Sequence, residues 1–346
     1  MSDGTFTYQE ITSQGRTWRL TLDAIKTPPA ELVAFLRKPW EEVVFTGCGS
    51  TYYLSLAASV IWQSLTGIPA RAAPASEIWL APESVIAEKP VLLVAVSRSG
   101  ETSETLHAID AFKRRAQDQF LSITCYQSSQ LALNSPYKLV TLGAEENSIA
   151  QTRSFSSMLL IAQTIAGIAA NNQKFIDEVR VLPDKFDRLI GSYESLAKAL
   201  AYNQNLSHFV FLGSGANYGL ACEAMLKMKE MSLSVSEAFH FMEFRHGPKS
   251  MVTPGTLIVG LIHAAARQQE ISVLEEMKDL GATVLALDDV GDGIKADHIV
   301  EFHSGLSALG RAPLHLPVLQ LLAYYRSISK GLDPDQPKNL EAVVVL

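Results

Sequence analysis

Short apolar runs alternate along this chain with segments long enough to form a helix, and this alternation restricts the possible folds most strongly. The runs lie at residues 43–47, 91–96, 121–126, 208–213, 256–262 and 283–288. Strands that are apolar throughout are typical of parallel sheets covered by helices on both faces. The pattern therefore predicts an α/β fold in which parallel sheets are flanked by helices.

The chain also repeats itself at a shift of 166 residues (213 minus 47). Gly-Cys-Gly-Ser-Thr-Tyr-Tyr-Leu at 47–54 aligns with Gly-Ser-Gly-Ala-Asn-Tyr-Gly-Leu at 213–220, and the same shift places the apolar run at 91–96 on 257–262. An ungapped match of this length predicts duplicated domains. The predicted divisions are an N-terminal arm (1–29), a first domain (30–165), a helical connector (166–195), a second domain (196–330) and a C-terminal tail (331–346).

Composition narrows the class of protein. A chain of 346 residues that is 47% hydrophobic can bury a large core, and its net charge of −7 argues against a nucleic-acid surface. No stretch approaches the roughly 20 apolar residues of a membrane span, and the start lacks a signal-peptide pattern. The three cysteines form no CxxC pair, so we expect no disulfide framework, metal site or cofactor. A cytoplasmic protein fits these features.

The apolar run at 91–96 leads directly into Ser97-Arg98-Ser99-Gly100-Glu101-Thr102. Ligands of parallel α/β sheets bind beyond the carboxyl ends of the strands. There, the hydroxyls, the free backbone N–H groups and the dipole of the following helix suit a phosphate. A simple Ser/Thr helix cap is the alternative interpretation of the same residues.

A second polar turn favours the phosphate pocket. Gly47-x-Gly49 is followed by Ser50 and Thr51 at the end of another predicted strand, and the third glycine of a dinucleotide-binding fingerprint is missing. In the second half of the chain, His-Ala-Ala-Ala at 263–266 stands where Ser97 to Gly100 stand in the first half. The hydroxyls therefore belong to the first half alone, as expected of a binding site.

Two further blocks follow along the chain, Glu223-x-x-x-Lys227-x-Lys229-Glu230 and Glu-Phe-Arg-His246-Gly-Pro. Together with the two polar turns, and in the same order, they resemble the tandem sugar isomerase (SIS) domains of glucosamine-6-phosphate synthase. The resemblance runs from about residue 40 to the C-terminal tail. It implies a five-stranded parallel sheet in each half and a phosphosugar pocket to which a second subunit contributes. A homodimer with shared active sites is therefore expected.

The resemblance also implies which residues bind the substrate. By position these are Ser50, Thr51, Ser97, Arg98, Ser99, Thr102, Ile149, Ala150, Gln151 and Glu223. Arg98 stands where the family usually has Gln, and a cation there is compatible with phosphate. The alternative interpretation of the segment around Ile149 is an ordinary helix start.

Moving a carbonyl between C1 and C2 of a sugar requires a group that carries a proton between the two carbons. Glu223, Lys227 and Glu230 share one helix face, which would be a solvated stripe if the helix were exposed. Their neighbours are mostly apolar, so the helix is expected to be buried, where charges need partners or a function. Glu230, with Lys227 beside it, is the predicted proton carrier.

Opening the sugar ring requires a second group, and His246 is the candidate. It lies in Arg-His-Gly-Pro, a rigid turn, and an imidazole exchanges protons near neutral pH. A lone histidine is more often structural. The resemblance implies that His246 reaches the pocket of the neighbouring subunit.

Two departures from the synthase matter. The chain begins about where the glutaminase domain of the synthase ends, and Ala342 occupies the position of the tail lysine that forms a Schiff base there. The predicted function is therefore a phosphosugar isomerase or deaminase acting on an amino-sugar or keto-sugar 6-phosphate. The alternatives are a fructosamine-6-phosphate deglycase, an ammonia-dependent aminotransferase, and a sugar-phosphate-sensing module without catalysis.

Overall fold

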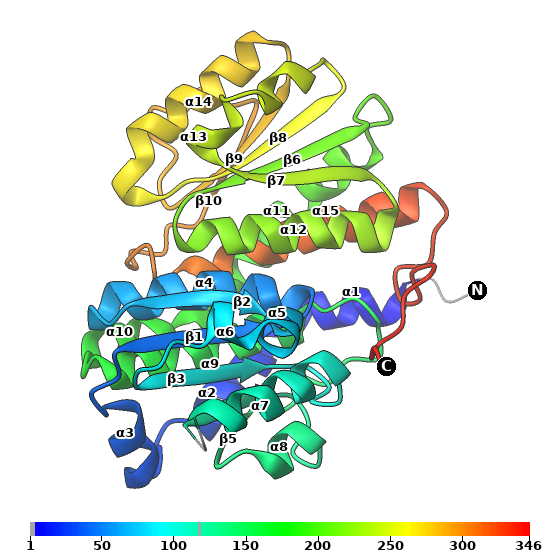
Figure 1. Cartoon of the computed structure of the whole chain (residues 1–346). Helices are drawn as coiled ribbons and strands as arrows, with labels where there is room; N and C mark the ends of the chain where they lie inside the picture. Colours follow the sequence, from blue (N-terminus) through cyan, green and yellow to red (C-terminus); the bar gives the residue numbers. More distant parts are fainter. Residues whose placement is uncertain (1–3, 117–118) are drawn as a thin grey trace. The chain divides into compact units, whose positions relative to one another are not determined.

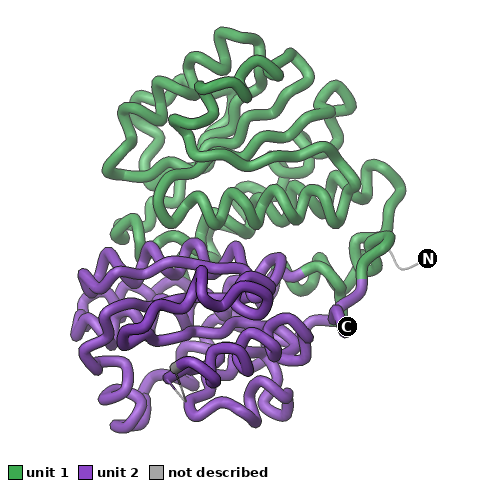
Figure 2. Tube along the Cα trace, viewed as in Figure 1, with its two compact units in different colours: residues 1–12, 147–150, 184–340 green, residues 13–146, 151–183, 341–346 purple. Residues whose placement is uncertain are grey.

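A computed structural model describes residues 4–116 and 119–346, and the chain divides into two compact units (Figure 2). Unit 1 comprises residues 1–12, 147–150 and 184–340, and unit 2 comprises residues 13–146, 151–183 and 341–346. Each unit contains one five-stranded sheet in which every neighbouring pair of strands is parallel. The predicted α/β fold is confirmed.

The sheet of unit 2 has the strand order β2-β1-β3-β4-β5. Its strands are β1 (Glu42–Gly47), β2 (Ala70–Pro74), β3 (Val91–Val96), β4 (Phe120–Thr124) and β5 (Tyr137–Val140). Its helices are α2 (Gln14–Ala24), α3 (Ala30–Leu36), α4 (Ser50–Thr66), α5 (Ala75–Leu80), α6 (Pro82–Val85), α7 (Ser103–Ala116), α8 (Gln130–Asn134), α9 (Arg153–Ala169) and α10 (Gln173–Arg180). Helices α4 and α9 contact one face of the sheet, and α5 and α7 pack together over the other (Figure 1).

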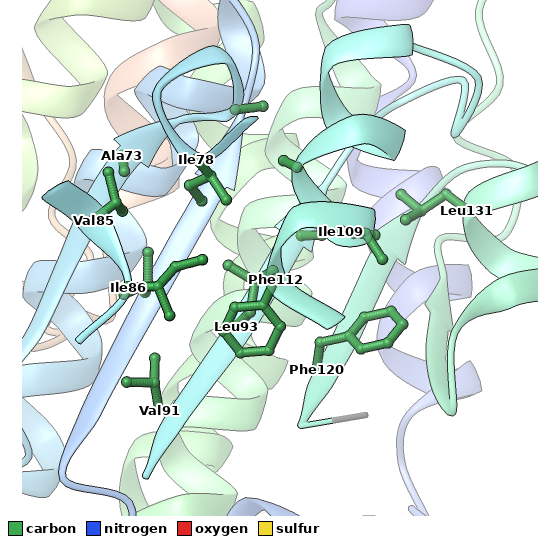
Figure 3. Packing of buried hydrophobic residues seen from close by; sticks show 14 residues of the cluster. Ala73, Ile78, Val85, Ile86, Val91, Leu93, Ile109, Phe112, Phe120 and Leu131 are labelled. Atoms are coloured by element: carbon green, nitrogen blue, oxygen red, sulfur yellow. The ribbon is translucent and has the colours of Figure 1, made fainter. Parts of the chain in front are cut away.

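The core of unit 2 explains why its central strand is apolar throughout. All six residues of β3 are buried, because helices cover both faces of the sheet. Figure 3 shows one of these faces, where Val91 and Leu93 of β3 lie among Ile109 and Phe112 of α7 and Phe120 of β4.

Unit 1 repeats this topology, with the strand order β7-β6-β8-β9-β10. Its strands are β6 (His208–Gly213), β7 (Val235–His240), β8 (Thr256–Leu261), β9 (Thr283–Asp288) and β10 (His298–Glu301). Its helices are α1 (Thr5–Thr12), α11 (Leu182–Tyr202, which begins two residues before the unit), α12 (Ala216–Ser232), α13 (Phe241–Phe244), α14 (Arg267–Asp279) and α15 (Leu316–Ser329), with 3₁₀ turns at Pro248–Met251, Ala264–Ala266 and Ala312–His315. Helices α12 and α15 pack together beside the sheet, and α14 contacts β8 and β9 from the other face (Figure 1).

The turn after the first strand of each half shows the duplication most clearly. Gly49 and Gly215 adopt nearly the same conformation with positive φ, with φ, ψ of 54°, −124° and 57°, −130°. A Cβ added at Gly47 would lie 2.4 Å from the Oγ1 atom of Thr51, and one at Gly213 would lie 2.3 Å from the carbonyl oxygen of Asn217. Both halves therefore need glycine at both positions of the turn.

Four strands were not among the six apolar runs: β2, β5, β7 and β10. These strands lie at the two edges of each sheet, and most of their residues are only partly buried. The predicted arm and tail are each shared between the units, since α1 and residues 331–340 belong to unit 1 and α2 and residues 341–346 to unit 2. The predicted domain boundaries stay a prediction. No helix among the described residues is long and apolar enough to cross a membrane.

Candidate active site

The loop between β3 and α7 gathers three of the predicted phosphate ligands. The Oγ atom of Ser97 accepts a hydrogen bond from the Gly100 N–H (3.1 Å) and lies 3.4 Å from Oγ1 of Thr102. The Oγ atom of Ser99 accepts from the Glu101 N–H (3.1 Å). Each serine hydroxyl thus uses a lone pair inside the loop. A hydroxyl that accepts one hydrogen bond also has a proton to donate, which suits a phosphate, and the role of these residues toward phosphate stays a prediction.

Gly100 fixes the shape of this loop. Its φ of +67° is in the left-handed region, and a Cβ there would lie 2.2 Å from Oγ of Ser129. No other residue fits without moving the loop.

The turn between β1 and α4 places Ser50 and Thr51 at the end of the strand next to β3. Oγ1 of Thr51 donates to the carbonyl of Cys48 and accepts from its N–H, both at 2.9 Å, so this hydroxyl closes the turn. Sγ of Cys48 lies 3.6 Å from Oγ1 of Thr105 in the first turn of α7, which brings the two polar turns side by side. Burial raises the pKa of the Cys48 thiol, which disfavours a nucleophilic role.

Arg98 is tied to two other segments of unit 2. Its Nη1 atom pairs with Oε2 of Glu146 at 3.3 Å, and its Nη2 atom donates to the carbonyl of Ala342 at 3.0 Å. Oε1 of Glu146 also accepts from the N–H (2.7 Å) and the hydroxyl (2.9 Å) of Thr152. Arg98 thus joins the loop to the C-terminal tail, and its role toward phosphate stays a prediction.

The tail of unit 2 also contacts the first residue of α7. The carbonyl of Val344 accepts from the Ser103 N–H (3.3 Å), and the Leu346 N–H donates to the Ser103 hydroxyl (3.0 Å). A cavity of about 280 Å³ lies between the tail and the loop. It is lined by Arg98, Ser99, Glu101, Tyr126, Ser128, Ser129, Glu146, Ala342 and Val343.

In unit 1, α12 brings the three predicted charges together. Nζ of Lys227 lies 3.4 Å from Oε1 of Glu223 and also forms an ion pair with Oε2 of Glu230. The side chains of Glu223 and Lys227 are 0% and 1% exposed, whereas that of Glu230 is 19% exposed. The helix is buried, as its apolar neighbours indicated, and Glu230 is the member of this ion triad that solvent reaches.

A second cavity, of about 180 Å³, lies beside Glu230 within unit 1. Its lining is Glu230, Met231, Leu233, Gly331, Leu332, Asp333, Gln336, Pro337 and Lys338. Glu230, the exposed member of the triad, therefore lines a cavity whose other residues include those of the segment after α15.

His246 lies in an exposed turn that is anchored on both sides. Arg245 and Lys249 bind the two carboxylate oxygens of Glu276 at 2.6 and 2.7 Å, and these bonds hold the pKa of Glu276 below its usual value. Gly247 has a φ of +119°, which only glycine adopts readily. Within the described residues no hydrogen bond or ion pair links His246 to the triad, and its role stays a prediction.

The predicted substrate-lining segment changes unit along its length. Ile149 and Ala150 belong to unit 1, where the Ile149 N–H donates to the carbonyl of Asp335 at 3.1 Å, and Gln151 belongs to unit 2. Sequence reasoning assigned no role to Glu146 or Glu10, the two buried carboxylates that hold this region in units 2 and 1. For Glu146, the sequence offered one indication of this role, the hydroxyl residues Thr152 and Ser154 that follow it. The described residues contain no group of three or more His, Cys, Asp or Glu side chains that could hold a metal ion.

The model of the SIS domain family matches residues 37–166 and 202–328. The chain belongs to the SIS domain family. It is 28% identical over 310 residues to the glutamine–fructose-6-phosphate aminotransferase of Methanothermobacter thermautotrophicus, covering 88% of this chain and 52% of that protein. The corresponding enzyme of Sulfurisphaera tokodaii is 30% identical, with 99% and 56% covered. The chain thus spans about half the length of the curated relatives it matches.

Two solved structures cover this chain almost end to end. The glucosamine-6-phosphate deaminase of Thermotoga maritima is 33% identical, with a TM-score of 0.79 and with 98% of this chain and 99% of that one covered. The tagatose-6-phosphate ketose/aldose isomerase of Escherichia coli is 26% identical, with a TM-score of 0.87 and with 97% and 96% covered. The similar proteins therefore include phosphosugar isomerases and a deaminase of nearly the same length.

Proposed function

We propose that this SIS protein is an enzyme that isomerises or deaminates an amino-sugar or keto-sugar 6-phosphate by moving a proton between C1 and C2. The observation that carries the proposal is the ion triad, in which the partly exposed carboxylate of Glu230 is fixed by buried Lys227 at the edge of a cavity. The end-to-end likeness to a glucosamine-6-phosphate deaminase supports the deaminase branch.

The phosphate group binds at the loop between β3 and α7. The hydroxyls of Ser97, Ser99 and Thr102 donate to its oxygens, and the N-terminal end of α7 adds a favourable dipole. The phosphate holds the substrate in place, and the chemistry occurs at the other end of the open-chain sugar.

Glu230 carries the proton. For glucosamine 6-phosphate in its aldehyde form, the carboxylate removes the proton from C2 to give an enolamine and returns it to C1. The C1 oxygen gains the proton that the nitrogen loses, which leaves a hydroxyl on C1 and an imine at C2. Water adds to C2 and ammonia leaves, so the product is fructose 6-phosphate. For a substrate without nitrogen the same transfer interconverts aldose and ketose. Lys227 positions the carboxylate, and Glu223 holds Lys227.

Ring opening is assigned to His246, supplied by the second subunit of a homodimer. The exposure of His246 and the anchoring of its turn by Arg245 and Lys249 support this assignment, because a donor to another subunit must project from a fixed base. Fructose 6-phosphate turnover by a stable monomer would contradict the shared site.

A second candidate is a fructosamine-6-phosphate deglycase, which uses the same proton transfer and releases a larger amine. The cavity of about 180 Å³ beside Glu230 favours it, since a substituent on the nitrogen would lie at the reacting end of the sugar. Ala342 has no amine, so neither candidate forms a Schiff base at that position.

The test compares four substrate mixtures: glucosamine 6-phosphate, a fructosamine 6-phosphate, fructose 6-phosphate with ammonia, and fructose 6-phosphate with glutamine. We expect ammonia from the first mixture, and amino-acid release from the second would favour the deglycase. Glu230→Gln preserves size and should keep binding while turnover falls by a factor of about 100 or more. Glu237→Gln, on exposed β7, is the matched control. Binding without turnover in every mixture would favour a sensing module.

A further inference from the structure

Residues 147–149 of unit 1 are held by their backbone N–H groups. The carboxylate of Glu10, which is 2% exposed, accepts from the N–H groups of Asn147 (2.6 Å) and Ser148 (3.4 Å) and from the Ser148 hydroxyl. The next N–H, that of Ile149, donates to the carbonyl of Asp335 (3.1 Å). Three consecutive backbone donors therefore bind acceptors in α1 and in the segment after α15.

Helix α1, which carries Glu10, is fastened at its own start. The carboxylate of Asp335, also 2% exposed, accepts from the N–H groups of Phe6 (3.2 Å) and Thr7 (2.7 Å) and from the Thr7 hydroxyl (2.7 Å). Gly4 packs so closely on Pro334 that a Cβ there would lie 2.6 Å from its Cγ. Asp335 thus fixes α1 with its side chain and Ile149 with its carbonyl.

The burial of the Glu10 and Asp335 carboxylates is unfavourable unless their hydrogen bonds are formed. If residues 147–149 only connected two elements across the surface, neither buried carboxylate would be needed. Both Glu10 and Asp335 also lie outside the two regions, 37–166 and 202–328, that match the family model.

We infer that α1 is a positioning element of the active site and that Glu10 is its positioning residue. Glu10 and Asp335 hold the backbone around Ile149 and Ala150 in the conformation that receives the carbon chain of the sugar. The inference rests on the proposed function, in which this segment lines the substrate. Glu10 itself does not touch the substrate.

The test replaces the acceptor without changing its size. In Glu10→Met both carboxylate oxygens are lost, so Asn147 and Ser148 lose their acceptor. Glu10→Gln would keep both backbone bonds, because both end on the same oxygen, Oε1. We expect the Kd for fructose 6-phosphate to rise about tenfold or more, while the Kd for inorganic phosphate is unchanged. Phosphate contacts only the loop of unit 2, so an unchanged urea transition by circular dichroism is needed to show that unit 1 stays folded. Glu31→Met, on the exposed side of α3, is the matched control.

Ser148→Ala is the milder variant, since it removes one hydroxyl bond to Glu10 and leaves the backbone bonds. It should raise the Kd for fructose 6-phosphate about threefold. An equal rise of the Kd for both probes in Glu10→Met, or a rise for neither, would overturn the inference.

Hydrogen exchange separates this inference from the proposed function. The amides of 147–149 should exchange at least tenfold faster in Glu10→Met than in the wild-type protein, with no ligand present. Unchanged exchange there refutes the positioning role alone. A wild-type protein that binds inorganic phosphate and not fructose 6-phosphate refutes both the proposed function and the role of α1 in it.

Discussion

Glu270 gives the sharpest prediction about stability. It lies in the first turn of α14, is 1% exposed, and accepts the His263 N–H at 2.7 Å. Burial raises the pKa of this carboxyl from 4.5 to about 7, and the nearby charge of Asp288 adds to the rise. The folded protein therefore binds the Glu270 proton more tightly than the unfolded chain does.

The sign and size of the effect follow from this difference. Between pH 4.5 and about 7 the folded state holds more protons than the unfolded state, so the free energy of unfolding falls as pH rises through that window. A difference of about 2.5 in pKa, at about 1.4 kcal/mol for each pKa unit, corresponds to about 3 kcal/mol. The loss is complete above about pH 7, where the buried carboxylate is charged.

Glu270→Gln removes the charge and keeps an acceptor for the His263 N–H. The variant should match the wild-type protein near pH 4 and exceed its free energy of unfolding by about 3 kcal/mol near pH 8. Urea unfolding followed by circular dichroism at several pH values measures this difference. All four tryptophans lie in unit 2, so tryptophan fluorescence follows that unit separately.

Glu275→Gln, on the same helix and partly exposed, is the control for loss of a carboxylate alone. It should leave the pH dependence as it is in the wild-type protein. If Glu270→Gln also follows the wild-type curve at every pH, burial does not disfavour the charge of Glu270 and the reasoning fails.

Two further predictions concern the loop in unit 2. Arg98→Ala leaves the buried carboxylate of Glu146 without its cation and should lower the free energy of unfolding by about 3 kcal/mol, seen as an earlier urea transition in tryptophan fluorescence. An unchanged transition would show that the donors of Thr152 and Ser154 satisfy Glu146 without Arg98. Gly100→Ala should cost about 2 kcal/mol or more, because a Cβ would meet Ser129 at a positive φ, and should weaken inorganic phosphate binding in calorimetry; retained affinity would contradict the loop assignment.

The sequence allowed the central part of the fold to be predicted, because the central strands are buried on both faces. Runs such as 91–96 contain no polar residue, so their pattern is visible without any partner. Edge strands such as β5 and β7 keep one side near solvent and mix Lys138 or Glu237 with apolar residues, so they resemble loops in the sequence. The apolar pattern alone did not reveal the edge strands. The duplication added a separate prediction, that both halves share one topology.

The candidate site was predictable where its residues are neighbours in the chain. Ser97 and Ser99 stand in one loop, and Lys227 is one helical turn from each of its glutamates. The ion pair between Arg98 and Glu146 joins residues 48 positions apart, and the bond from Asn147 to Glu10 spans 137. No local pattern encodes such pairs, because they form only when the sheet brings distant loops together.

The two halves of the duplication differ in the side chains that accept hydrogen bonds from the backbone N–H groups after their central strands. In unit 2 the loop after β3 uses the hydroxyl of Ser97, which can still donate to a phosphate. In unit 1 the N–H of His263 after β8 is taken by the carboxylate of Glu270, and the carboxylate of Asp288 lies near it at the end of β9. A dianion at the second position would meet the carboxylates of Glu270 and Asp288, so we expect one phosphosugar bound per chain. Calorimetric titration with fructose 6-phosphate measures this stoichiometry, and a value of two per chain would show that the second half kept a site despite its carboxylates.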